Sequence, residues 1–251
     1  MANKYGRQKI GAVLFWLMVW QICSIWIGQE ILLVSPVAVC KSLWDLIQEV
    51  SFWKSIVYSG WRIMGGFLWA VCLGASAAAC SARYRCFEIL LQPLVAVIKA
   101  TPVASFIILA LVWISSANLS VLIAFLMGFP VVYTNLLQGF CNADKQIWEM
   151  VCLLGVRHKI RYYWFPQLFP YLRAAMMTGI GLCWKAGIAA EVIGMPEGSM
   201  GERLQEAKIY LQMPSLFAWT VAIVAVSVCI EKLVLFLLMW LERKNKGQVV
   251  S

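Results

Sequence analysis

The sequence predicts an all-α integral membrane protein with about six transmembrane helices. Of the 251 residues, 62% are hydrophobic and 13% are charged, whereas a soluble domain carries about a quarter charged side chains. The stretch from Ala100 to Ala143 holds 44 residues without a charge, and one membrane crossing needs about 20 apolar residues. The stretch therefore holds two helices and a tight turn, which we expect at residues 115–118 because serine and asparagine favour turns.

Six apolar segments have the length and composition of membrane spans. The expected spans are residues 10–29, 60–80, 89–114, 118–140, 171–192 and 215–241. We expect the first to be a retained helix, because its tryptophans are bulky and no small-residue cleavage site follows it. The second is dense in glycine and alanine, which favours close helix packing in lipid over a pore lining. We expect residues 1–251 to form a single transmembrane domain.

Two of the connections carry helical signals of their own. Residues 42–57 place five apolar side chains on one helical face, so this segment is expected to lie on the membrane surface or to be a buried connecting helix. The five are Leu43, Ile47, Val50, Trp53 and Val57. Ser199 and Glu202 have the spacing of a capping box, which predicts that a helix begins after Ser199.

Basic residues are distributed unevenly between the two sides of the predicted domain. Six spans place both termini on one side, which carries thirteen lysines and arginines against four or five on the other. The larger set is Lys4, Arg7, Lys9, Arg83, Arg85, Lys145, Arg157, Lys159, Arg161, Arg173, Arg243, Lys244 and Lys246; the smaller is Lys41, Lys54, Arg203 and Lys208, with Arg62 at its edge. Basic connections remain in the cytoplasm. We therefore expect both termini and the 141–170 connection to be cytoplasmic, and we attribute the net charge of +9 to this bias and not to nucleic-acid binding.

The sequence contains no residue pattern typical of a catalytic site or a metal site. The nine cysteines show no paired CxxC spacing and most lie in apolar runs, so we interpret them as small hydrophobic residues. His158 is the single histidine, whereas zinc sites and acid–base enzymes need clustered ligands or catalytic groups. The phosphate-binding pattern GxxxxGK[ST] does not occur. We predict no catalytic residue, no metal and no bound cofactor.

Residues 144–170 form the longest connection on the basic side. Asp144–Leu154 is expected to be a short amphipathic helix, and Gly155 interrupts it because glycine permits a sharp change of direction. An aromatic run at residues 162–165 follows, and Pro166 cannot continue a helix without losing a backbone hydrogen bond. Such a segment forms a compact knob that suits a groove on a partner protein. From the residues alone, an ordinary interfacial loop explains the segment equally well.

This connection resembles the cytoplasmic loop of the inner-membrane permeases of binding-protein-dependent ABC importers, especially the nitrate, sulfonate and taurine group. That family carries a Glu-Ala-Ala motif, a glycine six residues after the Glu, and a Leu-Pro further on. Glu149, Gly155 and Pro166 hold those places here. Met150 and Val151 replace the alanines, a phenylalanine replaces the leucine, and the interval before the proline is about two residues shorter. The four residues Trp184, Ala189, Ala190 and Glu191 also resemble the group's fifth-span motif.

The resemblance implies a type I ABC importer permease in the cytoplasmic (inner) membrane. Its loop would be a coupling helix seated in a groove of an ABC ATPase subunit, and ATP would be used by that partner alone. The expected assembly is a homodimer with two copies of the ATPase and an extracellular or periplasmic solute-binding protein. By the resemblance, the coupling residues are Glu149, Met150, Val151, Gly155 and Pro166.

Ionisable side chains within the spans are functional candidates, because lipid insertion costs them about 2.5 kcal/mol or more. The clearest are Lys99, Lys185, Glu191, Glu231 and Lys232. Lys185 and Glu191 lie about 240° apart around a helix and cannot pair within it. Lys185 is expected either to line the translocation path and attract an anion, or to form a structural ion pair with Glu231 or another acid. Glu191 is expected either to bond the following connection or to contact the solute.

The main alternative function is a secondary transporter driven by an ion gradient. Such proteins are built from repeated halves whose broken helices meet at the midplane of the membrane. The sequence shows no convincing internal repeat, and such a transporter has no need for the 144–170 segment. The sequence does not choose among sulfonates, nitrate and uncharged cofactor precursors as the solute.

Overall fold

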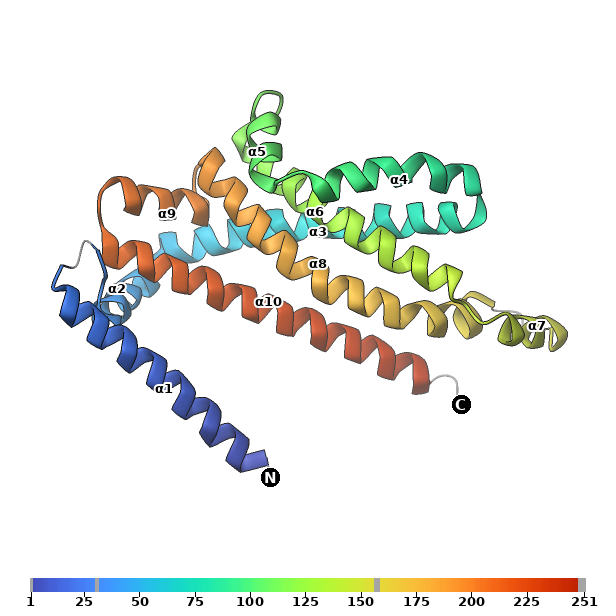
Figure 1. Ribbon diagram of the computed structural model, residues 1–251, viewed down its shortest axis with the longest axis horizontal. Helices are drawn as coiled ribbons and strands as arrows, with labels where there is room; N and C mark the ends of the chain where they lie inside the picture. The colour runs from blue at the N-terminus through green and yellow to red at the C-terminus, as the bar shows by residue number, and fades with distance from the viewer. Residues whose placement is uncertain (1, 30–31, 156–158, 248–251) are drawn as a thin grey trace.

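The computed structural model describes residues 2–29, 32–155 and 159–247, and all regular structure in them is helical. The helices are α1 (Ala2–Ile27), α2 (Pro36–Gln48), α3 (Val50–Arg83), α4 (Arg85–Ala100), α5 (Val103–Leu111), α6 (Ser116–Cys141), α7 (Lys145–Leu153), the π-helix η1 (Ile160–Trp164), α8 (Phe165–Gly194), α9 (Met200–Ile209) and α10 (Met213–Gly247). The long helices α3, α6, α8 and α10 run along the length of the molecule (Figure 1). The expected all-α membrane architecture is confirmed.

Four helical segments in the described residues are long and apolar enough to cross a membrane. They are Val50–Arg83, Ser116–Cys141, Tyr162–Gly194 and Met213–Arg243. The apolar part of α1, Gly11–Ile27, is shorter. Four of the six expected spans are thus recovered as continuous helices of sufficient length. The turn expected at residues 115–118 lies earlier, because α5 ends at Leu111 and α6 already begins at Ser116.

The third expected span, residues 89–114, is not one helix. α4 and α5 are bent by 100° relative to each other, and α5 points away from the long axis of the bundle (Figure 1). Thr101 is extended between them, and Pro102 is the N-cap of α5. Proline disfavours helical backbone in the residue before it. The expectation of one continuous helix was wrong because it weighed apolar length and not this proline. The bent pair together still has the length and composition of one broken span.

The expectation of one helix over residues 42–57 was also wrong. Glu49 is extended and separates α2 from α3, so the predicted apolar face is divided between two helices. The capping box is confirmed, because the Ser199 side chain accepts a hydrogen bond of 3.0 Å from the backbone N–H of Glu202. The helix predicted after Ser199 is α9.

Close packing of α3, α6 and α8 forms the centre of the molecule. Gly66 of α3 lies so close to α6 that an added Cβ would overlap the backbone carbonyl of Val121. A Cβ on Gly128 of α6 would lie 2.8 Å from both Ala70 Cβ and Cys183 Sγ. Small residues therefore set the spacing of the three helices, as in other membrane bundles.

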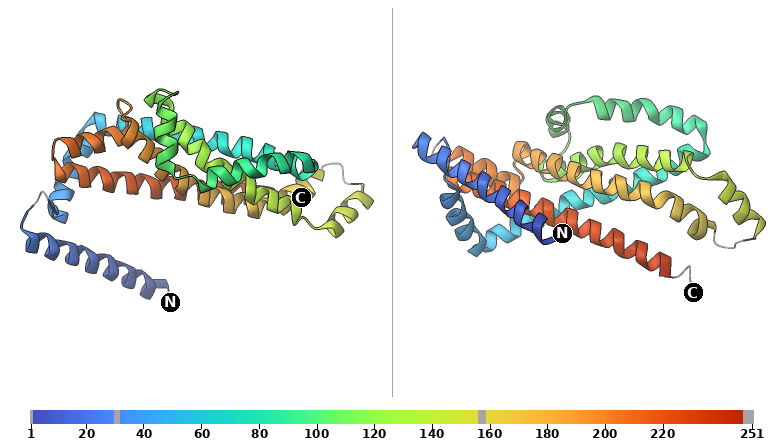
Figure 2. Two further views of the ribbon diagram at one scale, coloured as in Figure 1. Left: turned by 45° about the horizontal axis from the view of Figure 1, so that its top comes forward. Right: turned by 60° about the horizontal axis from the view of Figure 1, so that its bottom comes forward.

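The basic connections gather at one end of the molecule. The α3–α4 junction with Arg83 and Arg85, the helix α7, and the C-terminal end of α10 lie together there, which we call the α7 end (Figures 1 and 2). α2 and α9 lie at the opposite end, the α9 end. Arg157 and His158 of the predicted connection lie outside the described residues.

Gly66→Ala is expected to destabilise the protein by about 1–3 kcal/mol, because the added methyl group overpacks the α3–α6 contact. Its matched control is Gly65→Ala on the same helix, where a Cβ meets no atom within 4 Å. Thermal unfolding of the detergent-solubilised protein, followed by size-exclusion chromatography after heating, measures the difference. Equal melting temperatures for the two variants would contradict the close α3–α6 packing.

Candidate functional site

The segment between α6 and α8 contains the helix that the sequence predicts. Asp144 is the N-cap of α7, and its side chain accepts a 2.8 Å hydrogen bond from the N–H of Gln146. The helix ends at Leu153, and Gly155 follows with a φ of +61°, in the left-handed region. A glycine just past the end of a helix is favoured because it adopts this conformation without strain. The predicted interruption at Gly155 is therefore confirmed.

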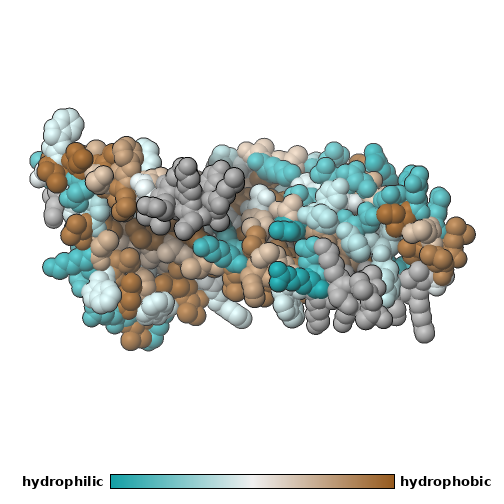
Figure 3. Space-filling model, turned by 90° about the horizontal axis from the view of Figure 1, so that it is seen from below, coloured by the Kyte–Doolittle hydropathy of each residue, from teal (hydrophilic) through white to brown (hydrophobic). Residues whose placement is uncertain are grey.

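One side of α7 is buried and the rest forms an exposed tip. Val151 is 6% exposed, whereas Met150 is 53%, Leu153 is 88% and Leu154 is 71% exposed. Glu149 is also exposed. Figure 3 shows apolar side chains at the extreme α7 end of the molecule, beside a surface rich in hydrophilic residues. An apolar tip within a polar surface marks an interaction site more often than a feature of a free surface.

Aromatic contacts fix α7 to the beginning of α8. The Tyr163 hydroxyl donates a 2.8 Å hydrogen bond to the backbone carbonyl of Asp144, and the Tyr163 and Trp148 rings lie 4.9 Å apart. Trp164 packs against Trp148 and against Phe140 at the end of α6, with centroid distances of 5.9 and 5.3 Å. The tip of α7 is thus joined to both α6 and α8.

Pro166 lies in the first turn of α8 and is exposed. Directly before it, the backbone N–H of Phe165 donates to the carbonyl of Ile160, which closes the wider turn of η1. Proline cannot donate a backbone hydrogen bond, and single π-turns occur at functional sites more often than chance predicts. The chain therefore passes into α8 through an irregular turn and not through a loop.

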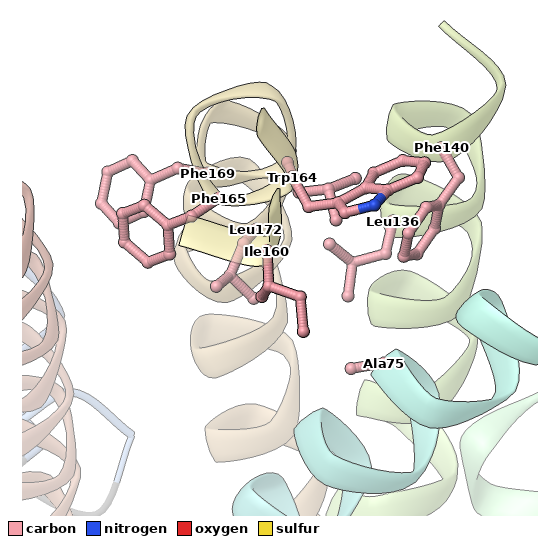
Figure 4. Close-up of a pocket in the computed structure, with 9 residues that line it drawn as sticks. Ala75, Leu136, Phe140, Ile160, Trp164, Phe165, Phe169 and Leu172 are labelled. Carbon is pink, nitrogen blue, oxygen red and sulfur yellow. The ribbon is translucent and has the colours of Figure 1, made fainter. Parts of the chain in front are cut away.

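An apolar pocket of about 230 Å³ lies beneath this junction. Trp164 and Phe140 lie together on one side of it, and Phe165 and Phe169 on the other (Figure 4). Ala75 of α3 lies at its base. Its lining is aliphatic and aromatic, so it presents no carboxylate or hydroxyl group to orient a polar solute. A second pocket, of about 310 Å³, is polar and lies near the α9 end, where Glu49, Arg203 and Glu206 line it.

Glu191 is fully buried and belongs to a hydrogen-bond network near the α9 end. Its carboxylate accepts a 2.6 Å hydrogen bond from the Ser59 hydroxyl of α3. The backbone N–H of Met200, the first residue of α9, donates 2.9 Å to the same Ser59 oxygen. Gly201 packs against the Glu191 backbone with no room for a side chain. The network ties α3, α8 and α9 together.

Lys185 lies on a different face of α8 from Glu191 and is exposed. The described residues form ion pairs at Arg85–Glu88, Arg173–Glu242 and Arg203–Glu206, and none of these includes Lys185. The Glu231 carboxylate lies beside Gly181, 3.0 Å from where a Cβ would stand. The Glu231 carboxylate therefore lies one helical turn from Lys185, although the two form no ion pair.

Sequence reasoning missed the partners that hold these residues. Ser59 is 132 positions from Glu191, and a serine in an apolar helix carries no local sign of such a bond. The Tyr163 bond to Asp144 was missed for the same reason. The aromatic run at 162–165 was the available signal, because buried tyrosine and tryptophan usually find a hydrogen-bond partner.

The apolar bundle and its projecting segment define a multi-pass membrane permease. Residues 70–247 match the family model described as "Binding-protein-dependent transport system inner membrane component". This match covers most of the chain, and the chain belongs to that family. It is therefore a permease of the inner membrane that serves a binding-protein-dependent importer.

The chain is also similar to individual permeases over most of its length. A probable ABC transporter permease of Brucella melitensis is 24% identical over 206 residues, which cover 81% of this chain and 83% of that protein. A putative aliphatic sulfonates transport permease of Bacillus subtilis is 23% identical over 227 residues, covering 86% and 82%. The taurine transport system permease of Escherichia coli is 22% identical over 233 residues, covering 89% and 84%. These findings favour the importer over the ion-driven transporter.

Tyr163→Phe is expected to loosen α7, because it removes the hydroxyl donor to Asp144 and such a bond contributes about 1 kcal/mol. Hydrogen exchange of the α7 amides should accelerate severalfold. Tyr162→Phe is the matched control, since Tyr162 is 40% exposed. Unchanged exchange in Tyr163→Phe would contradict the assigned contact.

Ser59→Ala is expected to free the beginning of α9, because it removes both the donor to Glu191 and the acceptor for Met200. Loss of a buried partner costs about 1–3 kcal/mol. Hydrogen exchange in the first turn of α9 should accelerate at least tenfold. Ser76→Ala on the same helix is the control, because Ser76 is exposed and bonds the carbonyl of Cys72 in its own helix. Equal exchange in both variants would show that Ser59 does not hold α9.

Proposed function

We propose that the chain forms the channel of an ATP-driven importer and that α7 with Gly155 and η1 couples it to a separate ABC ATPase. The observation that carries the proposal is the exposed apolar tip of α7, with Leu153 88% and Leu154 71% exposed. Glu149, Met150 and Gly155 would contact the groove of the ATPase, and Val151 would hold α7 against its own chain. Pro166 would set the direction of α8.

The contacts behind the tip support mechanical coupling. A docked helix transmits movement only when it is fixed to the element that must move. Tyr163 and Trp164 join α7 to the beginning of α8, and Phe140 at the end of α6 packs against Trp164. α8 then extends through the molecule to the α9 end (Figure 1). Displacement of the tip by ATP-driven closure would therefore tilt α6 and α8 together.

We assign the α7 end to the cytoplasm, because the basic connections gather there. The α9 end would then face the solute-binding protein, and the polar pocket lined by Glu49, Arg203 and Glu206 supports a contact with polar ligands or partners on that side. The assembly would be a homodimer of residues 1–251, one permease domain per copy, with two ATPase subunits. The chain itself would bind no cofactor, and ATP would be hydrolysed by the partner.

We assign Lys185 to the translocation path and Glu191 to the structure of its outer part. Lys185 is exposed within a span, where a charge facing lipid is unfavourable. Glu191 is buried and bonded through Ser59 to α9. Two relatives are named for aliphatic sulfonates and taurine, both of which carry a sulfonate anion. A small sulfonate is thus the solute class that we favour for this chain.

Leu153→Glu and Glu149→Lys are expected to abolish copurification of an ABC ATPase when the tagged chain is expressed in its own host and solubilised in mild detergent. Leu153→Glu places a negative charge in the proposed contact with the groove, and Glu149→Lys replaces a negative charge by a positive one. Recovery of the ATPase, quantified by mass spectrometry, should fall at least tenfold. Ile209→Glu is the matched control, because Ile209 is a similarly exposed apolar residue, at 58%, on α9.

Retention of the ATPase by the α7 variants would overturn the assignment of α7 as the coupling element. Failure to recover any ATPase with the wild-type chain in several mild detergents would count against the ATP-driven assembly as a whole.

A further inference from the structure

A second lysine lies on an exposed face within the membrane-spanning region. Lys99 is exposed at the end of α4, just before the bend at Thr101 and Pro102. Its ammonium group donates a 3.3 Å hydrogen bond to the Thr134 hydroxyl oxygen of α6. Thr134 in turn donates its own hydrogen to the carbonyl of Pro130, at 2.7 Å. The threonine oxygen is thereby oriented as an acceptor toward Lys99.

Lys99 and Lys185 flank one buried cluster of side chains. Their chain neighbours, Ile98 and Ala186, belong to that cluster together with Met127 of α6. The two lysines lie on α4 and α8, and both of these helices pack against α6.

Two threonine hydroxyl groups, those of Thr134 and Thr178, lie closer to the α7 end. Gly128 of α6 lies against Cys183 of α8, and Gly139 lies against Tyr171. Thr134 falls between these two contacts along α6, and Thr178 falls between them along α8. Thr178 is exposed and lies seven residues from Lys185, so the two share one face of the helix. The structure thus pairs Lys99 with the partly exposed Thr134 on α4 and α6, and places Lys185 and Thr178 on one exposed face of α8.

No carboxylate in the described part of the chain forms an ion pair with either lysine. An ammonium group has three hydrogens to donate, and the bond to Thr134 uses one from Lys99. A charge at mid-depth that faces lipid is costly, so such residues face water or another protein surface. The remaining hydrogens are available to water, a solute or a second chain, and those of Lys185 also to the Glu231 carboxylate, which lies beside Gly181 one helical turn away.

We infer that Lys99 and Thr134, together with Lys185, line a water-filled path through the membrane and make it selective for small anions. The inference rests on the proposed importer function and adds Lys99 as a residue that sets its specificity. Positive charges along one path raise the local concentration of anions and repel cations. The hydroxyl group of Thr134 would hold the Lys99 ammonium toward the path and replace part of its hydration.

The test measures the electrostatic potential at Thr134 without knowledge of the solute. Thr134→Cys is made in the full chain with its native cysteines and kept in the host membrane with its partners. The membranes are treated with an anionic sulfonatoethyl or a cationic trimethylammonioethyl methanethiosulfonate. Modification at position 134 is quantified by tandem mass spectrometry, with each reagent normalised to its reaction with a free thiol. The exposed native Cys229 of α10 serves as an internal reference outside the proposed path.

The anionic reagent is expected to modify the thiol introduced by Thr134→Cys about tenfold faster than the cationic one, because unscreened like charges at short range repel. Lys99→Gln should lower this ratio at least threefold, and Lys99→Arg should retain it. Lys232→Gln on α10, which removes an exposed lysine elsewhere, should leave the ratio unchanged. Absence of modification by both reagents would show that no water path reaches Thr134, and a ratio unaffected by Lys99→Gln would show that Lys99 does not set the potential.

The result separates this inference from the proposed function. The labelling ratio reports on water and charge beside Thr134 whether or not an ATPase copurifies with the chain. If Lys99→Gln still recovers the ATPase but leaves the ratio unchanged, the anion-selective path is wrong and the importer assembly stands. If Lys99→Gln lowers the labelling ratio but no ATPase is recovered even with the wild-type chain, the anion-selective path is supported and transport through it is not driven by an ABC ATPase.

Discussion

The close packing of α3, α6 and α8 is the interaction on which the rest of the structure depends. Hydrophobic burial does not drive helix association within lipid, because the lipid is as apolar as the side chains. Helix association therefore depends on close van der Waals contact between the helices, and Gly66, Gly74 and Gly128 permit that contact. The three helices then supply a rigid frame. α7 is attached to the frame at one end through Phe140 and Trp164, and α9 is attached at the other through Ser59.

The two ends of this frame are held by different kinds of interaction. The α7 junction is aromatic, with one hydroxyl bond from Tyr163, and lies above an apolar pocket. The α9 junction is a buried carboxylate network centred on Ser59, which bonds both Glu191 and Met200. Aromatic packing tolerates small displacements, whereas loss of a buried hydrogen-bond partner such as Ser59 is costly. Movement is therefore expected to enter at the α7 end and to leave the Glu191 network intact.

The sequence predicted those features that depend on local chemistry. The short helix that Gly155 interrupts and the helix that begins after Ser199 each follow from residues within one helical turn, and the structure confirms both. The bend after α4 was missed because apolar length was counted without regard to Pro102. The partner of Glu191 was beyond prediction, since Ser59 lies on another helix and one sequence contains no record of which helices meet.

Glu191 is buried within the protein, whereas Lys99 and Lys185 lie on its exposed surface. Glu191 has no exposed surface and is bonded to Ser59, so the protein itself holds this carboxylate. Lys99 and Lys185 are exposed and form no ion pair with a described acid. A protein gains nothing in stability from an unpaired ammonium group within a span, because insertion of that group is unfavourable. The Thr134 hydroxyl accepts one hydrogen bond from Lys99, and contact with water or a transported anion would offset the remaining cost of both groups, which is the physical reason for the proposed path.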